Sequence, residues 1–154
     1  MDKSNIHKIV FGAERANRNA KGEYIPHAPL STSTARIIKT PGDNGAAFSN
    51  PIVERRDGEI GWQIASIVVG LARHLGLRIP VIGKIRSVEF SCSRILPSKD
   101  DPDFRTFFVK VTTMDGRVFS AENPLSRNQN VKECADLIAT QVLANYFPEL
   151  ENEL

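Results

Sequence analysis

Residues 107–123 read FFVKVTTMDGRVFSAEN, a stretch in which two short segments rich in apolar residues flank a turn. The first segment has an apolar residue at every second position from Phe107 to Val111, which is typical of a half-buried strand. The Asp-Gly pair at 115–116 is a signal for a tight type I′ turn, and residues 117–121 then return as the partner strand. The stretch therefore predicts a β-hairpin.

The sequence before the hairpin predicts one more strand and a helix. Residues 87–93, SVEFSCS, alternate between polar and apolar side chains, as a half-buried strand requires. Further upstream, Asp57 can accept hydrogen bonds from the free amides of a first helical turn, and Gly76 can adopt the left-handed conformation that ends a helix. Between them, apolar residues recur at helical spacing: Ile60, Ile64, Ile67, Val68, Leu71 and Leu75.

A second helix is expected after the hairpin. Asn123-Pro124 ends the last strand, and Asn130 with Glu133 has the spacing of a capping box. The helix has an apolar stripe formed by Val131, Cys134, Ala135, Ile138, Val142 and Tyr146. Pro148 then prevents the helix from continuing.

These elements predict an α+β fold of the order α-β-β-β-α. A three-stranded antiparallel meander would be packed by two helices on one face, because so small a sheet needs a helix layer to bury its apolar side. The opposite face would stay open, and it would carry Glu89, Ser91, Phe108, Lys110 and Thr112.

The first third of the chain predicts an extended N-terminal arm. Residues 1–56 contain prolines and glycines at a density that excludes long regular elements, with room for short strands at 6–11 and 36–39. The α-β-β-β-α domain would then occupy residues 57–154. No internal repeat is visible along the chain.

The net charge of +2 is unevenly distributed. Residues 1–56 contain nine Lys or Arg against five Asp or Glu, whereas residues 57–154 contain eleven against thirteen. A polyanion would be attracted to the arm first, although a solvated or partner-bound tail explains the same charges equally well. The candidate ligand-binding cations of the arm are Lys8, Arg15, Arg18, Lys21, Arg36 and Lys39.

No catalytic or metal site is expected, and no cofactor is predicted. The sequence contains no P-loop, GxGxxG, HExxH or GxSxG motif. The carboxylates at 100–103 lack the spacing of a calcium loop, and His74 suits the negative end of a helix dipole better than the role of a general base. Cys92 and Cys134 fall on apolar stripes, which favours two buried thiols over a metal or redox pair.

The order of elements resembles the double-stranded-RNA-binding domain over about residues 60–147, with HLGLRIP ending the first helix, the hairpin at 107–123, and VKECADLIATQVL in the closing helix. That family binds phosphate through lysines at the start of the closing helix, where this chain has Arg127 and Lys132 as candidates. The loop that would enter the minor groove reads PSKDDPD, which is acidic. The resemblance therefore implies a member of the fold that serves protein contacts.

A second likeness is to single-strand annealing proteins of the Erf and Redβ type. The segments IRSVEF and VKVTTMDGRVF are similar to the meander of their β-β-β-α core, which a helix precedes. This resemblance implies an association with nucleic acid.

The leading functional interpretation is a non-catalytic protein-interaction module, such as an inhibitor, adaptor or assembly subunit, that binds a protein partner or further copies of itself. The alternative is a protein that binds RNA or single-stranded DNA with the arm on the phosphates, and a small enzyme with an unrecognised site is a third. The longest apolar run, 60–72, is shorter than the roughly 20 residues that span a bilayer, so no membrane segment is expected. With two cysteines and no visible secretory signal, a cytoplasmic or other reducing compartment is expected.

Overall fold

A computed structural model describes residues 5–15, 20–23, 32–43, 48–52, 55–81, 84–94, 104–123 and 128–148. Within these ranges the chain forms six strands and two helices. Their bounds are β1 (Lys8–Glu14), β2 (Thr32–Ile38), β3 (Phe48–Ile52), α1 (Arg55–His74), β4 (Ile85–Ser93), β5 (Thr106–Thr113), β6 (Val118–Asn123) and α2 (Gln129–Tyr146).

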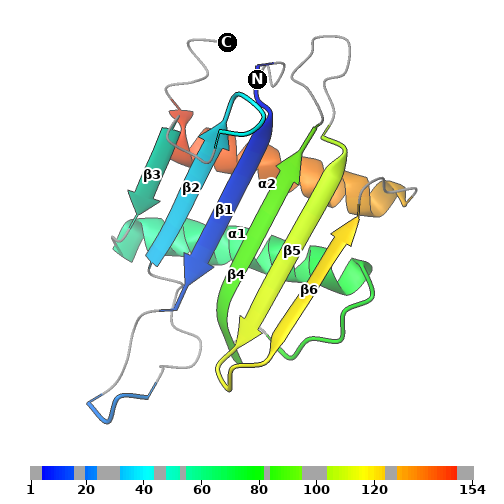
Figure 1. The fold of residues 1–154 in the computed structure, drawn as a ribbon. Coiled ribbons are helices and arrows are strands. Elements are labelled where there is room, and N and C mark those ends of the chain that lie inside the picture. Colours follow the sequence, from blue (N-terminus) through cyan, green and yellow to red (C-terminus); the bar gives the residue numbers. More distant parts are fainter. Residues whose placement is uncertain are drawn as a thin grey trace.

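All six strands belong to one antiparallel sheet in the order β3-β2-β1-β4-β5-β6. Both helices pack on the same face of this sheet, side by side, as Figure 1 shows. No described element covers the opposite face. This uncovered surface is called the open face below.

The expected three-stranded meander with an N-terminal arm is wrong. β1 lies in the middle of the sheet between β2 and β4, so residues 1–56 supply half of the strands. The central position of β1 could not be predicted from its own residues, KIVFGAE. This strand becomes buried only by pairing with β2 and β4, which are distant along the chain. β3 contains Pro51, and it is tolerated there because β3 is an edge strand.

The second half of the chain agrees more closely with expectation. The predicted strands and both helices are present, and the helices share one face of the sheet. The predicted caps are wrong in detail. Residue 57 lies inside α1, and α2 is capped by Asn128, whose side-chain oxygen accepts from the Asn130 amide at 3.0 Å. Gly76 does follow α1 with a φ of 90°.

The β5–β6 turn is a three-residue loop and not a type I′ turn. The Gly116 amide donates to the Thr113 carbonyl at 3.0 Å, and the Thr113 amide donates to the Arg117 carbonyl at 2.9 Å. Gly116 has a φ of 86°, the left-handed conformation that this longer hairpin loop needs at its last position.

The hydrophobic core fills the space between the sheet and the helices. The central pair of β1 and β4 is Phe11 opposite Phe90, and both side chains are fully buried. The Phe11 ring lies 5.8 Å from the ring of Tyr146 at the end of α2, which ties the middle of the sheet to the helix layer. β1 is therefore buried as completely as β4.

The chain is built from two halves with the same topology. The first half is β1-β2-β3-α1 and the second is β4-β5-β6-α2, so each is a three-stranded meander followed by a helix. The halves meet where β1 pairs antiparallel with β4, which relates them by a local two-fold axis through the middle of the sheet. The absence of a repeat expected from the sequence is thus corrected by the structure.

Side-chain contacts repeat with the same symmetry. Arg15 follows β1 and donates from Nε to the Ile85 carbonyl at 3.0 Å, while Arg94 follows β4 and donates from Nε to the Ile6 carbonyl at 2.5 Å. Both guanidinium groups are fully buried and lie over an aromatic ring, at 5.2 Å from Trp62 and 5.1 Å from Phe104. Each arginine therefore joins the end of the first strand of its own half to the start of the first strand of the other half.

Candidate functional site

The open face is the largest candidate surface, because no described helix lies against it. Its side chains come from alternate positions of the strands, as the register requires. The predicted open-face residues lie there, at neighbouring positions: Glu89 is opposite Lys110, and Ser91 is opposite Phe108. The sequence therefore predicted the facing of β4 and β5 correctly.

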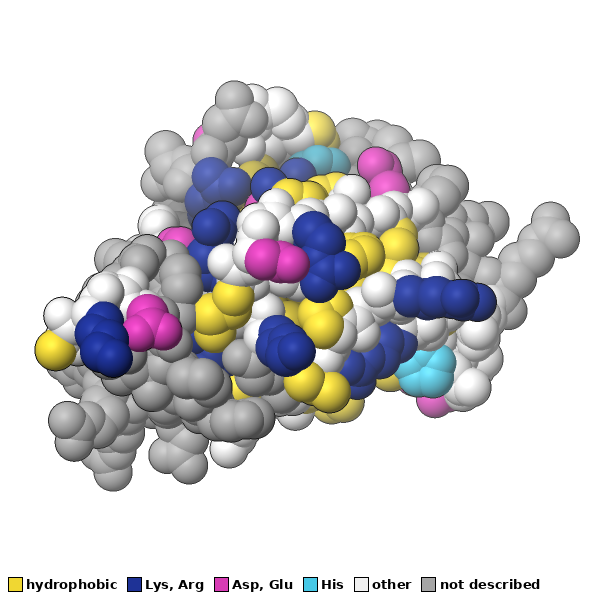
Figure 2. All heavy atoms as spheres, turned by 90° about the horizontal axis from the view of Figure 1, so that it is seen from below, with side chains coloured by type: hydrophobic (Ala, Val, Ile, Leu, Met, Phe, Trp, Pro, Cys, Tyr) yellow, Lys and Arg dark blue, Asp and Glu magenta, His cyan; other side chains and the backbone are white. Residues whose placement is uncertain are grey.

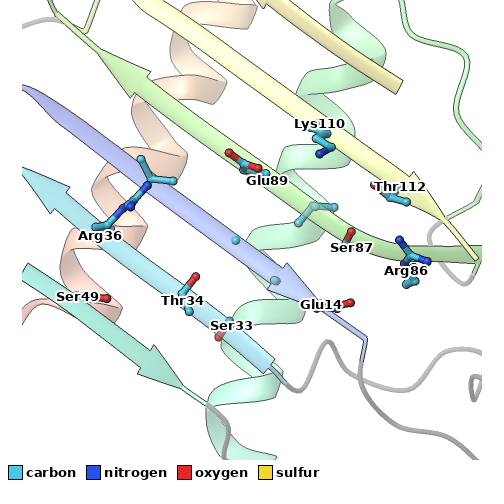
Figure 3. Close-up of a pocket in the computed structure, with 14 residues that line it drawn as sticks. Glu14, Ser33, Thr34, Arg36, Ser49, Arg86, Ser87, Glu89, Lys110 and Thr112 are labelled. Atoms are coloured by element: carbon cyan, nitrogen blue, oxygen red, sulfur yellow. The ribbon is translucent and has the colours of Figure 1, made fainter. Parts of the chain in front are cut away.

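A hollow of about 620 Å³ lies at the centre of this face. Figure 3 shows Arg36 from β2, Glu89 from β4 and Lys110 from β5 among the residues that line it. Gly12 of β1 has no side chain to fill the space. A Cβ at this position would lie 3.5 Å from Thr34 Oγ1, an ordinary contact, so the glycine leaves the surface bare without being sterically required.

A smaller hollow of about 260 Å³ adjoins the first, and Glu89 lines both. It lies toward the other end of the face, between Lys8 of β1 and Glu122 of β6. The partly exposed Phe108 ring contributes apolar surface to it. The open face is thus a concave strip with polar walls and a few apolar patches.

The charges of the open face nearly balance. Its cations are Lys8, Arg36, Lys110 and, at its margin, Arg86, and its anions are Glu14, Glu89 and Glu122. Opposite charges are interspersed across neighbouring strands, and a directly opposed pair such as Glu89 and Lys110 stabilises a sheet by roughly 0.2–1 kcal/mol. With four cations against three anions, the face has an excess of only one positive charge.

The structure brings together only part of the predicted cation set. Lys8 and Arg36 lie on the open face. Lys21 is exposed in the β1–β2 connection, and Lys39, half-buried, follows β2. Lys132 is half-buried on α2, in the layer away from the open face.

Arg15, which was predicted as a ligand-binding cation, does not lie on the surface. Its side chain is fully buried against Trp62 and the Ile85 carbonyl, and burial lowers the pKa of its guanidinium. It is therefore part of the framework and not a surface ligand for phosphate. Arg18 and Arg127 lie outside the described residues, as do the carboxylates at 100–103.

The remaining candidate residues are one histidine and two cysteines. His74 is exposed in the last turn of α1, beside Arg73. Cys92 is buried as expected, but Cys134 is partly exposed on α2, so the prediction of two buried thiols holds for one of them. The described residues contain no cluster of three or more metal-ligating side chains and no helix long and apolar enough to cross a bilayer.

A second surface, rich in cations, was not predicted from the sequence. Arg73, Arg78, Lys84 and Arg86 lie at the end of the sheet where β1 and β5 end and β4 begins, and they are called the basic end below. Figure 2 views the molecule from this end and shows more dark blue than magenta side chains over it. The sequence feature that could have indicated the basic end is the absence of acidic residues between Glu59 and Glu89.

A search of protein-family models, of curated proteins and of solved structures gives no match to this chain. The assignment of a function therefore depends on the surfaces described above.

Proposed function

We propose that this protein is a protein-interaction module that binds its partner on the open face of the sheet. The observation that supports the proposal is the charge pattern, with four cations and three glutamates interspersed on one concave surface. A surface of this kind has little net attraction for a polyanion. It is complementary to another protein surface that carries both signs.

The composition of the face fits the same role. Serines and threonines such as Thr34 and Ser87 supply hydrogen-bonding groups along the strands, and Phe108 offers a partly exposed aromatic ring. Protein interfaces commonly combine aromatic and arginine anchors with a polar rim. Arg36 and Phe108 are the two residues of the face best suited to act as such anchors.

Arg36 and Lys110 give the interface a two-fold character. Val10 and Glu89 each precede the central phenylalanine of their strand, and Arg36 is paired with Val10 as Lys110 is paired with Glu89. The two cations therefore occupy the same position in the two halves. A partner is expected to place acidic groups against both of them.

The experiment is affinity capture from the source cells with wild-type protein, with the Arg36→Glu, Lys110→Glu double variant, and with Arg105→Glu as a control. Arg105 is exposed just before β5 and lines neither hollow. We expect a partner retained at near-physiological salt by wild type and control, and lost from the double variant. A partner set that is unchanged in the double variant contradicts the proposal. Sedimentation of the purified chain shows whether the partner is a second copy.

A further inference from the structure

The cations of the basic end are close together in the sequence, and the path of the chain after α1 places them on one surface. The stretch between Glu59 and Glu89 contains cations and no carboxylate. Gly76, with its φ of 90°, ends α1 and turns the chain away from the helix axis. The residues that follow then return along the end of the sheet to start β4.

Hydrogen bonds hold this segment in place. The Arg73 guanidinium donates to the Pro80 carbonyl at 3.0 Å, which lays that side chain over the connection. The Lys84 carbonyl accepts from the Met114 amide at 2.9 Å, and the Arg86 carbonyl accepts from the Arg15 amide at 2.6 Å. The backbone that carries the cations is thus fixed to both neighbouring strands.

The side chains of the basic end remain accessible. Arg73, Arg78 and Lys84 are exposed, while Arg86 is half-buried at the margin of the open-face hollow. Two carboxylates lie at the same end of the sheet: Glu14 ends β1 and lines the open-face hollow with Arg86, and Asp115 belongs to the adjacent hairpin. Asp115 accepts from the Thr113 hydroxyl and from Arg117 Nε at 3.0 Å, and these two donors hold the pKa of its carboxyl below its usual value.

From this geometry we infer that the basic end binds the phosphate backbone of nucleic acid. Three exposed cations and one half-buried cation, spread along the end of the sheet, suit a repeating chain of phosphates better than one small anion. None of the four residues is aromatic, so bases have no stacking platform within this set. Binding is therefore sequence-independent. The inference is separate from the open-face proposal, which concerns a different surface.

The test uses the full chain and fluorescein-labelled duplex DNA, with duplex RNA of the same sequence as a second probe, titrated across a salt series. The test variant is Arg73→Gln, Arg78→Gln, Lys84→Gln. The control is Lys8→Gln, Lys39→Gln, Arg105→Gln, which removes three cations from the opposite end of the sheet. Thermal melts confirm that both variants are folded.

If all four cations contact phosphates, wild-type affinity falls by about a hundredfold between 50 and 200 mM salt, because each contact adds about 0.9 to the slope of log K against log salt. The test variant should lower that slope by about 2.7, and the control should leave it unchanged. Absence of binding at low salt, or an equal loss in the control, overturns the inference. So does binding to phosphatidylserine vesicles without binding to either duplex, which would make the surface a membrane contact.

Discussion

The two halves of the molecule differ in their surfaces much more than in their framework. Phe11 and Phe90 occupy the same central position, and Arg15 and Arg94 make the same bond to the opposite half. On the open face, by contrast, the position held by Val10 in one half is held by Glu89 in the other. Packing therefore restricts the helix-facing residues in both halves, whereas the exposed positions are free to differ for binding.

The first prediction tests whether the second half of the molecule folds without the strands of the first half. A fragment of residues 57–154 retains the whole second half but loses β1, so Phe90 and Val88 lose the strand that completes their sheet. We expect the fragment to show no cooperative thermal transition, since neither helix can bury its apolar face on three strands. Circular dichroism of the fragment beside the full chain measures this. Cooperative unfolding of the fragment would mean that the halves are independent.

The sequence revealed the second half because its signals are local. Alternation over residues 87–93 and the Asp-Gly turn at 115–116 can be read within a short window. The first half lacks such signals, since β2 reads TSTARII and β3 reads FSNPI, and both become strands through long-range pairing. The prediction of an arm followed from that difference.

The repeat itself was present in the sequence in a faint form. IHKIVFGAER at residues 6–15 and IRSVEFSCSR at residues 85–94 share an isoleucine, a central phenylalanine and a closing arginine. The pattern is too sparse to recognise until the structure shows that both arginines reach across to the opposite isoleucine. The open-face residues of β4 and β5 could be predicted, whereas the basic end required the path of the chain after Gly76.

The second prediction concerns the central pair. Phe11→Ala and Phe90→Ala should each lower the free energy of unfolding by about 3–5 kcal/mol, because each removes a fully buried ring from the core. Urea denaturation of the two variants measures the loss. If Phe11 belonged to a peripheral arm, its replacement would cost less than about 0.5 kcal/mol, and the equivalence of the halves would fail.

The third prediction concerns the buried arginines. Arg15→Met and Arg94→Met should each cost about 1–3 kcal/mol, since each leaves a buried carbonyl without its side-chain donor. The two sites lie at opposite ends of the β1–β4 pair, so the double variant should lose the sum of the two within about 0.5 kcal/mol. If either single variant were as stable as wild type, the hydrogen bond of that arginine to the opposite half would not contribute to the stability of the fold.

The last prediction concerns the smallest difference between the halves, His7 in the first against Arg86 in the second. Each residue's carbonyl accepts from the amide of the arginine that follows the opposite central strand, so the two positions are equivalent. Burial lowers the pKa of the His7 imidazole below its ordinary value of 6.5, and this effect outweighs a hydrogen bond to the Arg94 backbone, which acts in the opposite direction. The imidazole Nδ1 has no hydrogen-bond partner among the residues that the structure describes.

A lowered pKa in the folded state means that the unfolded chain binds the proton more readily. The contribution of His7 to stability is therefore complete above about pH 6.5 and is lost as the pH falls through the lower folded-state value. Urea midpoints measured between pH 7.5 and 5.5 should fall for wild type and fall less for His7→Gln. Equal slopes would show that protonation of His7 does not affect folding. Because the change in protonation takes place at His7, the pH-dependent weakening should be confined to the end of the sheet that carries this residue. Amide protection, corrected for the intrinsic exchange rate, should then decrease with acidity for His7, whose amide donates to the Ile38 carbonyl, and for Arg94, whose amide donates to the His7 carbonyl. It should decrease later for Arg15, whose amide donates to the Arg86 carbonyl.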